Sequence, residues 1–92
     1  MKQVLLLITT ENNKKGAKKM AKLLLKKKLA SCVSLKKIYS LYEWEGNIET
    51  VNEVEITIKS KPELKKTLIA FLKQITSYDL PQIIYKKFNS EK

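Results

Sequence analysis

The chain has 92 residues and a formal net charge of +10, with 19 lysines, no arginine and no histidine. This length allows one small domain with a modest core, expected over residues 1–92 and ordered over about 2–88, and the single cysteine excludes an internal disulfide and fits a reducing cytosol. Without histidine or arginine the chain lacks the commonest general base and the bidentate phosphate ligand, and no apolar run is long enough for a membrane span, so neither an enzyme nor a secreted or membrane protein is expected.

Residues 3–9 form the first predicted strand, and a helix is predicted over about 14–28. The strand is apolar without alternation, which is typical of a strand covered on both faces. Polar side chains at residues 10–13 can cap the helix, and Gly16 in its first turn costs about 1 kcal/mol against alanine. The buried stripe of the helix is predicted from apolar residues at helical spacing and their neighbours: Ala17, Met20, Ala21, Leu23, Leu24 and Leu25. Lysines occupy the opposite face, where a solvated surface is favoured over a nucleic-acid surface.

A long β-hairpin is predicted from Cys32 to Ser60, with its reversal at Gly46-Asn47. Its strands exceed the roughly 5–6 residues that are usual. Large apolar groups near the tip point to both faces of the ribbon, with Ile38, Tyr42 and Trp44 on one face and Tyr39 and Leu41 on the other. A two-stranded ribbon cannot bury both of its faces, so we expect the chain to oligomerise.

The last third of the chain predicts a second helix and a final strand. Ser60, Pro62 and Glu63 form a predicted capping box for a helix that ends near Ile75. Residues 76–82 are a loop fixed by Pro81, and residues 83–88 are the last strand. The order β-α-β-β-α-β predicts an α+β, ferredoxin-like sandwich with one antiparallel sheet and both helices on one face.

Several functions known for ferredoxin-like domains are excluded because this chain lacks the residues that they need. A metal chaperone needs paired cysteines, an RNA-recognition module needs aromatic residues on its central strands, and a phosphate-binding enzyme of this fold needs arginine. We interpret Cys32 as a small buried hydrophobe rather than a reactive thiol, and Tyr78 as a lock for its loop. Carboxylates near the hairpin tip can bind a hard cation, although a solvated role is favoured: Glu43, Glu45, Glu49 and Glu53.

Four motifs in order along the chain resemble those of the CutA divalent-cation tolerance family. Residues 29–33 resemble its L-A-A-C-V/A segment, and residues 38–49 resemble its S-x-Y-x-W-E-G-K-I-E hairpin. Residues 53–60 resemble its E-V-x-L-x-I-K-T strand, and residues 78–84 resemble its P-Y-x-x-P-E-I/L-I stretch. The Trp-Glu-Gly sequence at residues 44–46 is the most specific of these motifs.

The resemblance implies a cytoplasmic, non-enzymatic homotrimer similar to that of the PII signalling proteins, associated with tolerance of copper and other divalent metals. The chain departs from the family at four ligand or loop positions: a histidine is Thr76, a proline is Ser77, a glutamate is Gln82 and a cysteine is Ile8. Copper prefers imidazole and thiolate, so copper binding is not carried over with these residues. The remaining candidate metal ligands are Cys32, Glu45 and Asp79.

A pocket between subunits is expected where the hairpin meets the loop, with six candidate residues: Tyr39, Tyr42, Trp44, Glu45, Tyr78 and Pro81. The leading hypothesis is a trimeric protein of metal tolerance. The alternative is a PII-like module whose pockets sense a small anion or a protein partner, motivated by the basic charge. An enzyme that uses Tyr78, Asp79 and Cys32 is least favoured, because the chain offers no paired acid and base.

Overall fold

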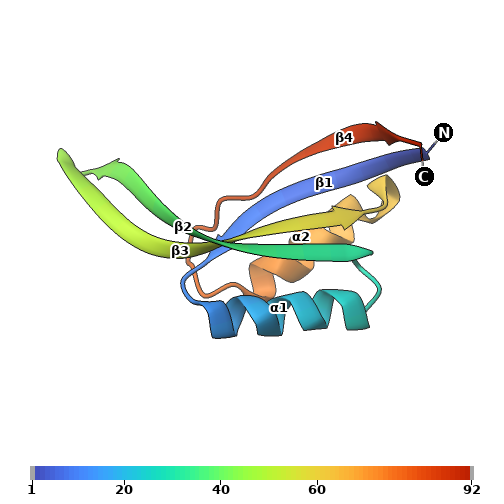
Figure 1. Cartoon of the computed structure of the whole chain (residues 1–92), viewed down its shortest axis with the longest axis horizontal. Helices are drawn as coiled ribbons and strands as arrows, with labels where there is room; N and C mark the ends of the chain where they lie inside the picture. Colours follow the sequence, from blue (N-terminus) through green and yellow to red (C-terminus); the bar gives the residue numbers. More distant parts are fainter. Residues whose placement is uncertain (1, 92) are drawn as a thin grey trace.

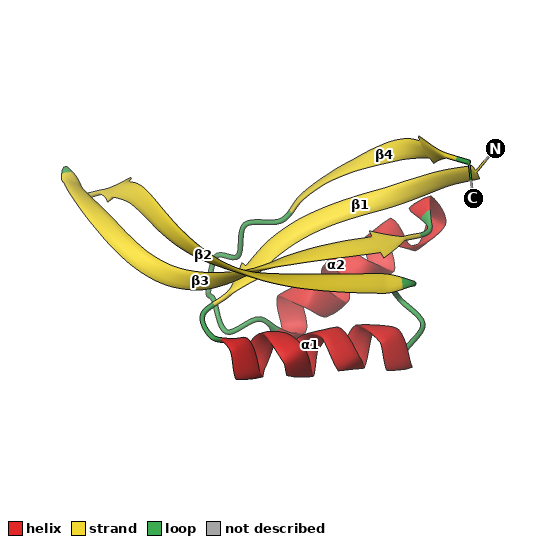
Figure 2. Ribbon diagram, viewed as in Figure 1, coloured by secondary structure: helices red, strands yellow, loops and turns green. Residues whose placement is uncertain are grey.

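The computed structural model describes residues 2–91. Its elements, in order, are β1 (Lys2–Glu11), α1 (Lys14–Lys26), β2 (Cys32–Trp44), β3 (Asn47–Ser60), the 3₁₀ turn η1 (Pro62–Leu64), α2 (Lys65–Ile75) and β4 (Ile84–Ser90). The four strands form one antiparallel sheet in the order β2-β3-β1-β4, and both helices lie on the same face of it (Figures 1 and 2). This arrangement confirms the predicted α+β, ferredoxin-like fold.

The core lies between the sheet and the two helices. Side chains alternate along β1, so Leu5 and Leu7 point to the helices and are fully buried, whereas Leu6 and Ile8 point to the open face and are only partly buried. The buried apolar side chains come from both helices, the two central strands and one connecting loop: Leu5, Leu7, Ala17, Met20, Leu24, Leu29, Val54, Ile56, Ile58, Leu68 and Leu72.

Helix α1 ends two residues earlier than predicted, at Lys26. Lys28 adopts a left-handed conformation with φ 58°, and the Leu29 N–H donates to the carbonyl of Leu24 at 2.9 Å. This is a Schellman-type end, which turns the chain so that Leu29 enters the core. The prediction that Leu25 is buried is wrong, because this side chain lies beside the terminus and is 44% exposed.

The hairpin pairs along its full length, from Cys32 opposite Lys59 to Trp44 opposite Asn47. Its two-residue loop is Glu45–Gly46, with φ 49° and 80°, so the predicted reversal at Gly46-Asn47 is displaced by one residue. Two successive positive φ angles match the twist of the flanking strands. Pairing of β3 with β1 ends at Val54, and the hairpin projects alone beyond that point (Figure 1), which makes the molecule 45 Å long.

The predicted capping box is wrong. Ser60 is the last residue of β3, and its hydroxyl donates to the Leu29 carbonyl at 2.6 Å instead of capping a helix. The segment after it forms η1 before α2 begins, with no side-chain cap at Lys61. The first and last strands also reach further than predicted, because β1 extends to Glu11 and β4 continues to Ser90.

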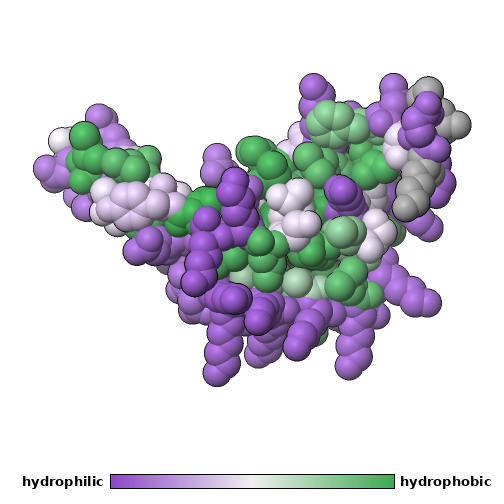
Figure 3. Space-filling model, viewed as in Figure 1, coloured by the Kyte–Doolittle hydropathy of each residue, from purple (hydrophilic) through white to green (hydrophobic). Residues whose placement is uncertain are grey.

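The face of the sheet opposite the helices is uncovered in the single chain. Cross-strand pairing places Ile8 beside Ile84 and Val4 beside Phe88 on this face. Ile84 is 50% exposed and Phe88 is 45% exposed. Figure 3 shows hydrophobic residues along the sheet and on the projecting hairpin, whereas hydrophilic residues gather over the helices. The lysines of α1 are exposed there, as the predicted solvated face requires.

Candidate functional site

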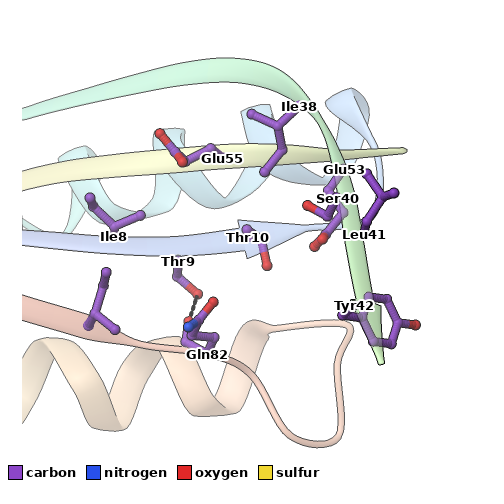
Figure 4. A pocket seen from close by; sticks show the side chains of 11 residues that line it. Ile8, Thr9, Thr10, Ile38, Ser40, Leu41, Tyr42, Glu53, Glu55 and Gln82 are labelled. Atoms are coloured by element: carbon purple, nitrogen blue, oxygen red, sulfur yellow. Dashed lines mark hydrogen bonds between the residues drawn. The ribbon is translucent and has the colours of Figure 1, made fainter. Parts of the chain in front are cut away.

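A groove of about 410 Å³ lies on the open face, where the hairpin bends away from β1 (Figure 4). We call it the open-face groove. Its lining combines apolar side chains, such as Ile38 and Ile84, with the carboxylates of Glu53 and Glu55. A hollow of about 330 Å³ continues it toward the loop at residues 76–82 and shares Tyr42 and Glu53 with it.

Strand periodicity explains why the hairpin contributes these side chains. Ile38, Ser40 and Tyr42 alternate along β2 and therefore point to one face. Cross-strand pairing places Glu53 opposite Ile38 on that same face. Figure 4 shows Ser40, Glu53 and Tyr42 following the hairpin, with Thr10 and Gln82 on the neighbouring elements.

Tyr78 connects the loop to the hairpin. Its hydroxyl donates to Oε2 of Glu53 at 3.0 Å. Partial burial, the hydrogen bond to Glu53 and the negative charges of Glu53 and Glu11 together raise the pKa of Tyr78 to about 12. The phenol is therefore held in its neutral, donating form, which agrees with the interpretation of Tyr78 as a lock for the loop.

Both ends of this loop are fixed to the end of β1. The Glu11 carboxylate is 4% exposed, and its Oε1 accepts from the Ser77 N–H at 3.2 Å and from the Thr76 hydroxyl at 3.4 Å. At the other end, the Thr9 hydroxyl donates to the Gln82 carbonyl at 2.8 Å. Glu11 was not among the residues predicted from the sequence, although its position carried a signal: it continues the inward-facing series of alternate residues in β1.

The structure places only some of the predicted pocket residues together. Tyr42 and Tyr78 both line the hollow beside the groove. Tyr39 lies on the opposite face of the hairpin and is 62% exposed, and Trp44 and Glu45 lie at the hairpin end. Pro81 is in the loop, outside the groove lining.

The three candidate metal ligands do not converge. Cys32 begins β2 and Glu45 follows its far end, about 40 Å away along an extended strand. The prediction that Cys32 is buried is wrong, because its thiol lies on an exposed position of the outermost strand. Asp79 is exposed in the loop. Within residues 2–91, no three His, Cys, Asp or Glu side chains gather into a group that could hold a metal ion.

The groove's own charge is negative in a strongly basic chain. Glu53 and Glu55 line it, and no lysine of the described chain does so. This lining does not favour the small anion that the net charge suggested, because carboxylates repel anions. None of the helices formed by residues 2–91 has the length and apolar character needed to cross a membrane.

Comparison with known proteins relates nearly the whole chain to one family. The family described as "CutA1 divalent ion tolerance protein" matches residues 5–92. The "Divalent-cation tolerance protein CutA" of Pectobacterium atrosepticum is 42% identical over 62 residues, which are 66% of this chain and 56% of that relative. The aligned segment thus spans just over half of the relative's length.

Solved structures share the fold closely. The divalent ion tolerance protein CutA1 of Ehrlichia chaffeensis has a TM-score of 0.92 and 30% identity, covering 100% of this chain and 87% of that one. The periplasmic divalent cation tolerance protein CutA of Archaeoglobus fulgidus has a TM-score of 0.86 and 31% identity, covering 97% and 85%.

Proposed function

The chain belongs to the CutA1 divalent ion tolerance family, and from this premise we propose that it serves in divalent-cation tolerance as a non-enzymatic, cytoplasmic homotrimer with a PII-like arrangement. The match over residues 5–92, together with the shared fold, is the observation that supports the role. The single cysteine and the absence of a membrane-length helix from residues 2–91 are compatible with the location.

The exposed apolar surface supports assembly. The open face carries Ile8 and Ile84 in register, and the projecting hairpin exposes large side chains on both of its faces: Tyr39, Leu41, Tyr42, Trp44 and Ile48. Contiguous apolar surface of this kind marks sites of subunit contact. We propose that these surfaces are buried against other copies of the chain.

The proposed role in metal tolerance does not include tight coordination of copper by the side chains of a single chain. Copper favours imidazole and thiolate, and the chain has no histidine and one exposed cysteine. The groove instead offers the carboxylate oxygens of Glu53 and Glu55, which suit harder divalent cations.

Light scattering tests the assembly. We expect a mass about three times the 10.7 kDa of one chain at micromolar concentration. Ile8→Lys, on the open face, should release smaller species, whereas the control Lys18→Ala on the exposed face of α1 should not. A stable monomer of the unaltered protein would contradict the proposal.

Growth of a deletion strain in Cu²⁺ and Zn²⁺ tests the role, together with calorimetry of each ion against the purified protein. We expect the strain to be more sensitive to at least one ion and the gene to restore growth. Unchanged tolerance and no saturable binding would reject metal tolerance.

A PII-like ligand-binding module is the second candidate, and the open-face groove of about 410 Å³ favours it. A ligand that binds only the folded protein raises its melting temperature by mass action. A thermal-shift screen of cationic and neutral metabolites should then yield at least one concentration-dependent shift. No shift across the screen would remove this candidate.

A further inference from the structure

A buried carboxylate lies behind the open-face groove without lining it. Glu11 ends β1 and is 4% exposed, and it is not among the residues that line the groove or the hollow beside it. Burying a carboxylate is unfavourable unless hydrogen bonds replace its water. At Glu11 the replacement comes from the loop, because Ser77 and Thr76 both donate to Oε1.

The same contacts continue to the groove. The Thr76 hydroxyl, which donates to Glu11, also accepts from the Tyr78 N–H at 3.2 Å. The Tyr78 side chain then crosses to the hairpin and donates to Glu53 at 3.0 Å. A continuous series of hydrogen bonds therefore joins the end of β1 to the middle of β3 through three consecutive loop residues.

Helix α1 leaves space for this carboxylate. A methyl group added at Gly16 would lie 3.3 Å from Oε2 of Glu11 and 3.3 Å from Oδ1 of Asn13, which is tighter than most contacts. Asn13 is also fixed, because its Oδ1 accepts from the Gly16 N–H at 2.8 Å. The glycine in the first turn thus has a packing reason, and the carboxylate has little freedom to move.

We propose that Glu11 is the positioning residue of the open-face groove and its adjoining hollow: its carboxylate holds the backbone of Ser77 and the hydroxyl of Thr76. Tyr78 is thereby placed to line the hollow and to reach Glu53, which lines both the hollow and the groove. The inference rests on the proposed role of the groove as a binding site. It adds a residue that acts on that site from outside it. The charge of Glu11 also contributes to the raised pKa of Tyr78, so its effect extends to the lining of the hollow.

Amide hydrogen exchange on the full chain tests the contacts directly. In Glu11→Ala the Ser77 N–H loses a charged acceptor, and we expect its exchange to accelerate roughly 10- to 100-fold, as a hydrogen bond to a charged group implies. Tyr78 N–H should accelerate as well, because Thr76 loses its anchor. In Glu11→Gln the amide oxygen still accepts, so exchange at Ser77 should stay within about threefold of the unaltered protein.

Titration of the Tyr78 phenol separates positioning from general stabilisation. We expect Glu11→Ala to lower the pKa of Tyr78 from about 12 toward its ordinary value, with Tyr78→Phe identifying the signal. If Glu11→Ala does not fold, Thr76→Val is the variant that tests the same series of hydrogen bonds. It removes the acceptor of the Tyr78 N–H, whose exchange should accelerate about 2- to 10-fold.

Unchanged exchange at Ser77 and Tyr78 with an unchanged Tyr78 pKa in the folded variants would overturn the proposal. These measurements need no metal or ligand, so their failure is distinguishable from failure of the proposed function.

Discussion

Tyr78→Phe removes only the hydroxyl that fixes the loop to the hairpin. In the unaltered protein this hydroxyl donates to Oε2 of Glu53 at 3.0 Å. A hydrogen bond to a charged acceptor contributes about 1.5–3 kcal/mol where it is buried, and solvent reduces this at a partly exposed residue. Near neutral pH we therefore expect the variant to be about 1 kcal/mol less stable.

Alkaline pH should erase this difference. Tyr78 has a pKa of about 12 in the folded chain against an ordinary value of 10.0, so above pH 10 the unfolded chain releases this proton first. The unfolded state then binds fewer protons, and the contribution of Tyr78 to stability is lost as pH rises through about 12. The full shift corresponds to about 2.7 kcal/mol, which solvent screening lowers to about 1 kcal/mol at this site.

The assay is urea unfolding followed by circular dichroism, at one protein concentration, from neutral pH to about pH 12. The lysines are the same in both proteins, so their effect cancels in the difference. Tyr39→Phe is the matched control, because Tyr39 is 62% exposed on the opposite hairpin face and should show no such difference. A difference in unfolding free energy between the unaltered protein and Tyr78→Phe that stays constant over this pH range would refute the contact with Glu53.

Three further changes test the packing, the end of α1 and its surface charge. Ile56→Ala in the core should cost about 2–5 kcal/mol in urea unfolding, whereas Ile48→Ala, at a residue 75% exposed, should change the unfolding free energy of dissociated chains by less than about 0.5 kcal/mol. Lys28→Gly should stabilise the chain by about 1 kcal/mol in the same assay, because glycine adopts the φ of 58° without strain; a loss would refute the left-handed helix end. Lys18→Glu replaces a repulsive pair with Lys22 by an attractive one and should add about 0.4–1 kcal/mol in thermal melts at low salt, and a gain that persists in high salt would contradict the charge explanation.

The fold was predictable because its signals are local. Alternation in β3, helical spacing in α1 and the glycine at the hairpin turn each specify an element without knowledge of the rest. The predicted turn was one residue too far along the chain, because glycine and asparagine both tolerate positive φ. Only the register of the folded hairpin shows that Asn47 already pairs with Trp44.

The groove was less predictable because its contacts join distant segments. Ser60 and Pro62 match a capping pattern, yet the serine hydroxyl donates to Leu29, 31 residues earlier. Glu11 meets a loop more than 60 residues away, and only the folded sheet brings the two together. Exposure of Cys32 likewise depends on β2 being an outer strand, which sequence neighbours do not reveal.

The end of pairing between β1 and β3 at Val54 governs how a solitary chain behaves. Beyond this point, the described part of β3 has β2 along one side and no strand along the other. β2 is itself one of the two outer strands of the sheet. The projecting arm therefore presents two rows of free peptide groups, and such rows template the addition of further strands. We expect slow assembly to divert chains into aggregates, so the yield of native protein depends on how fast partner chains cover the arm.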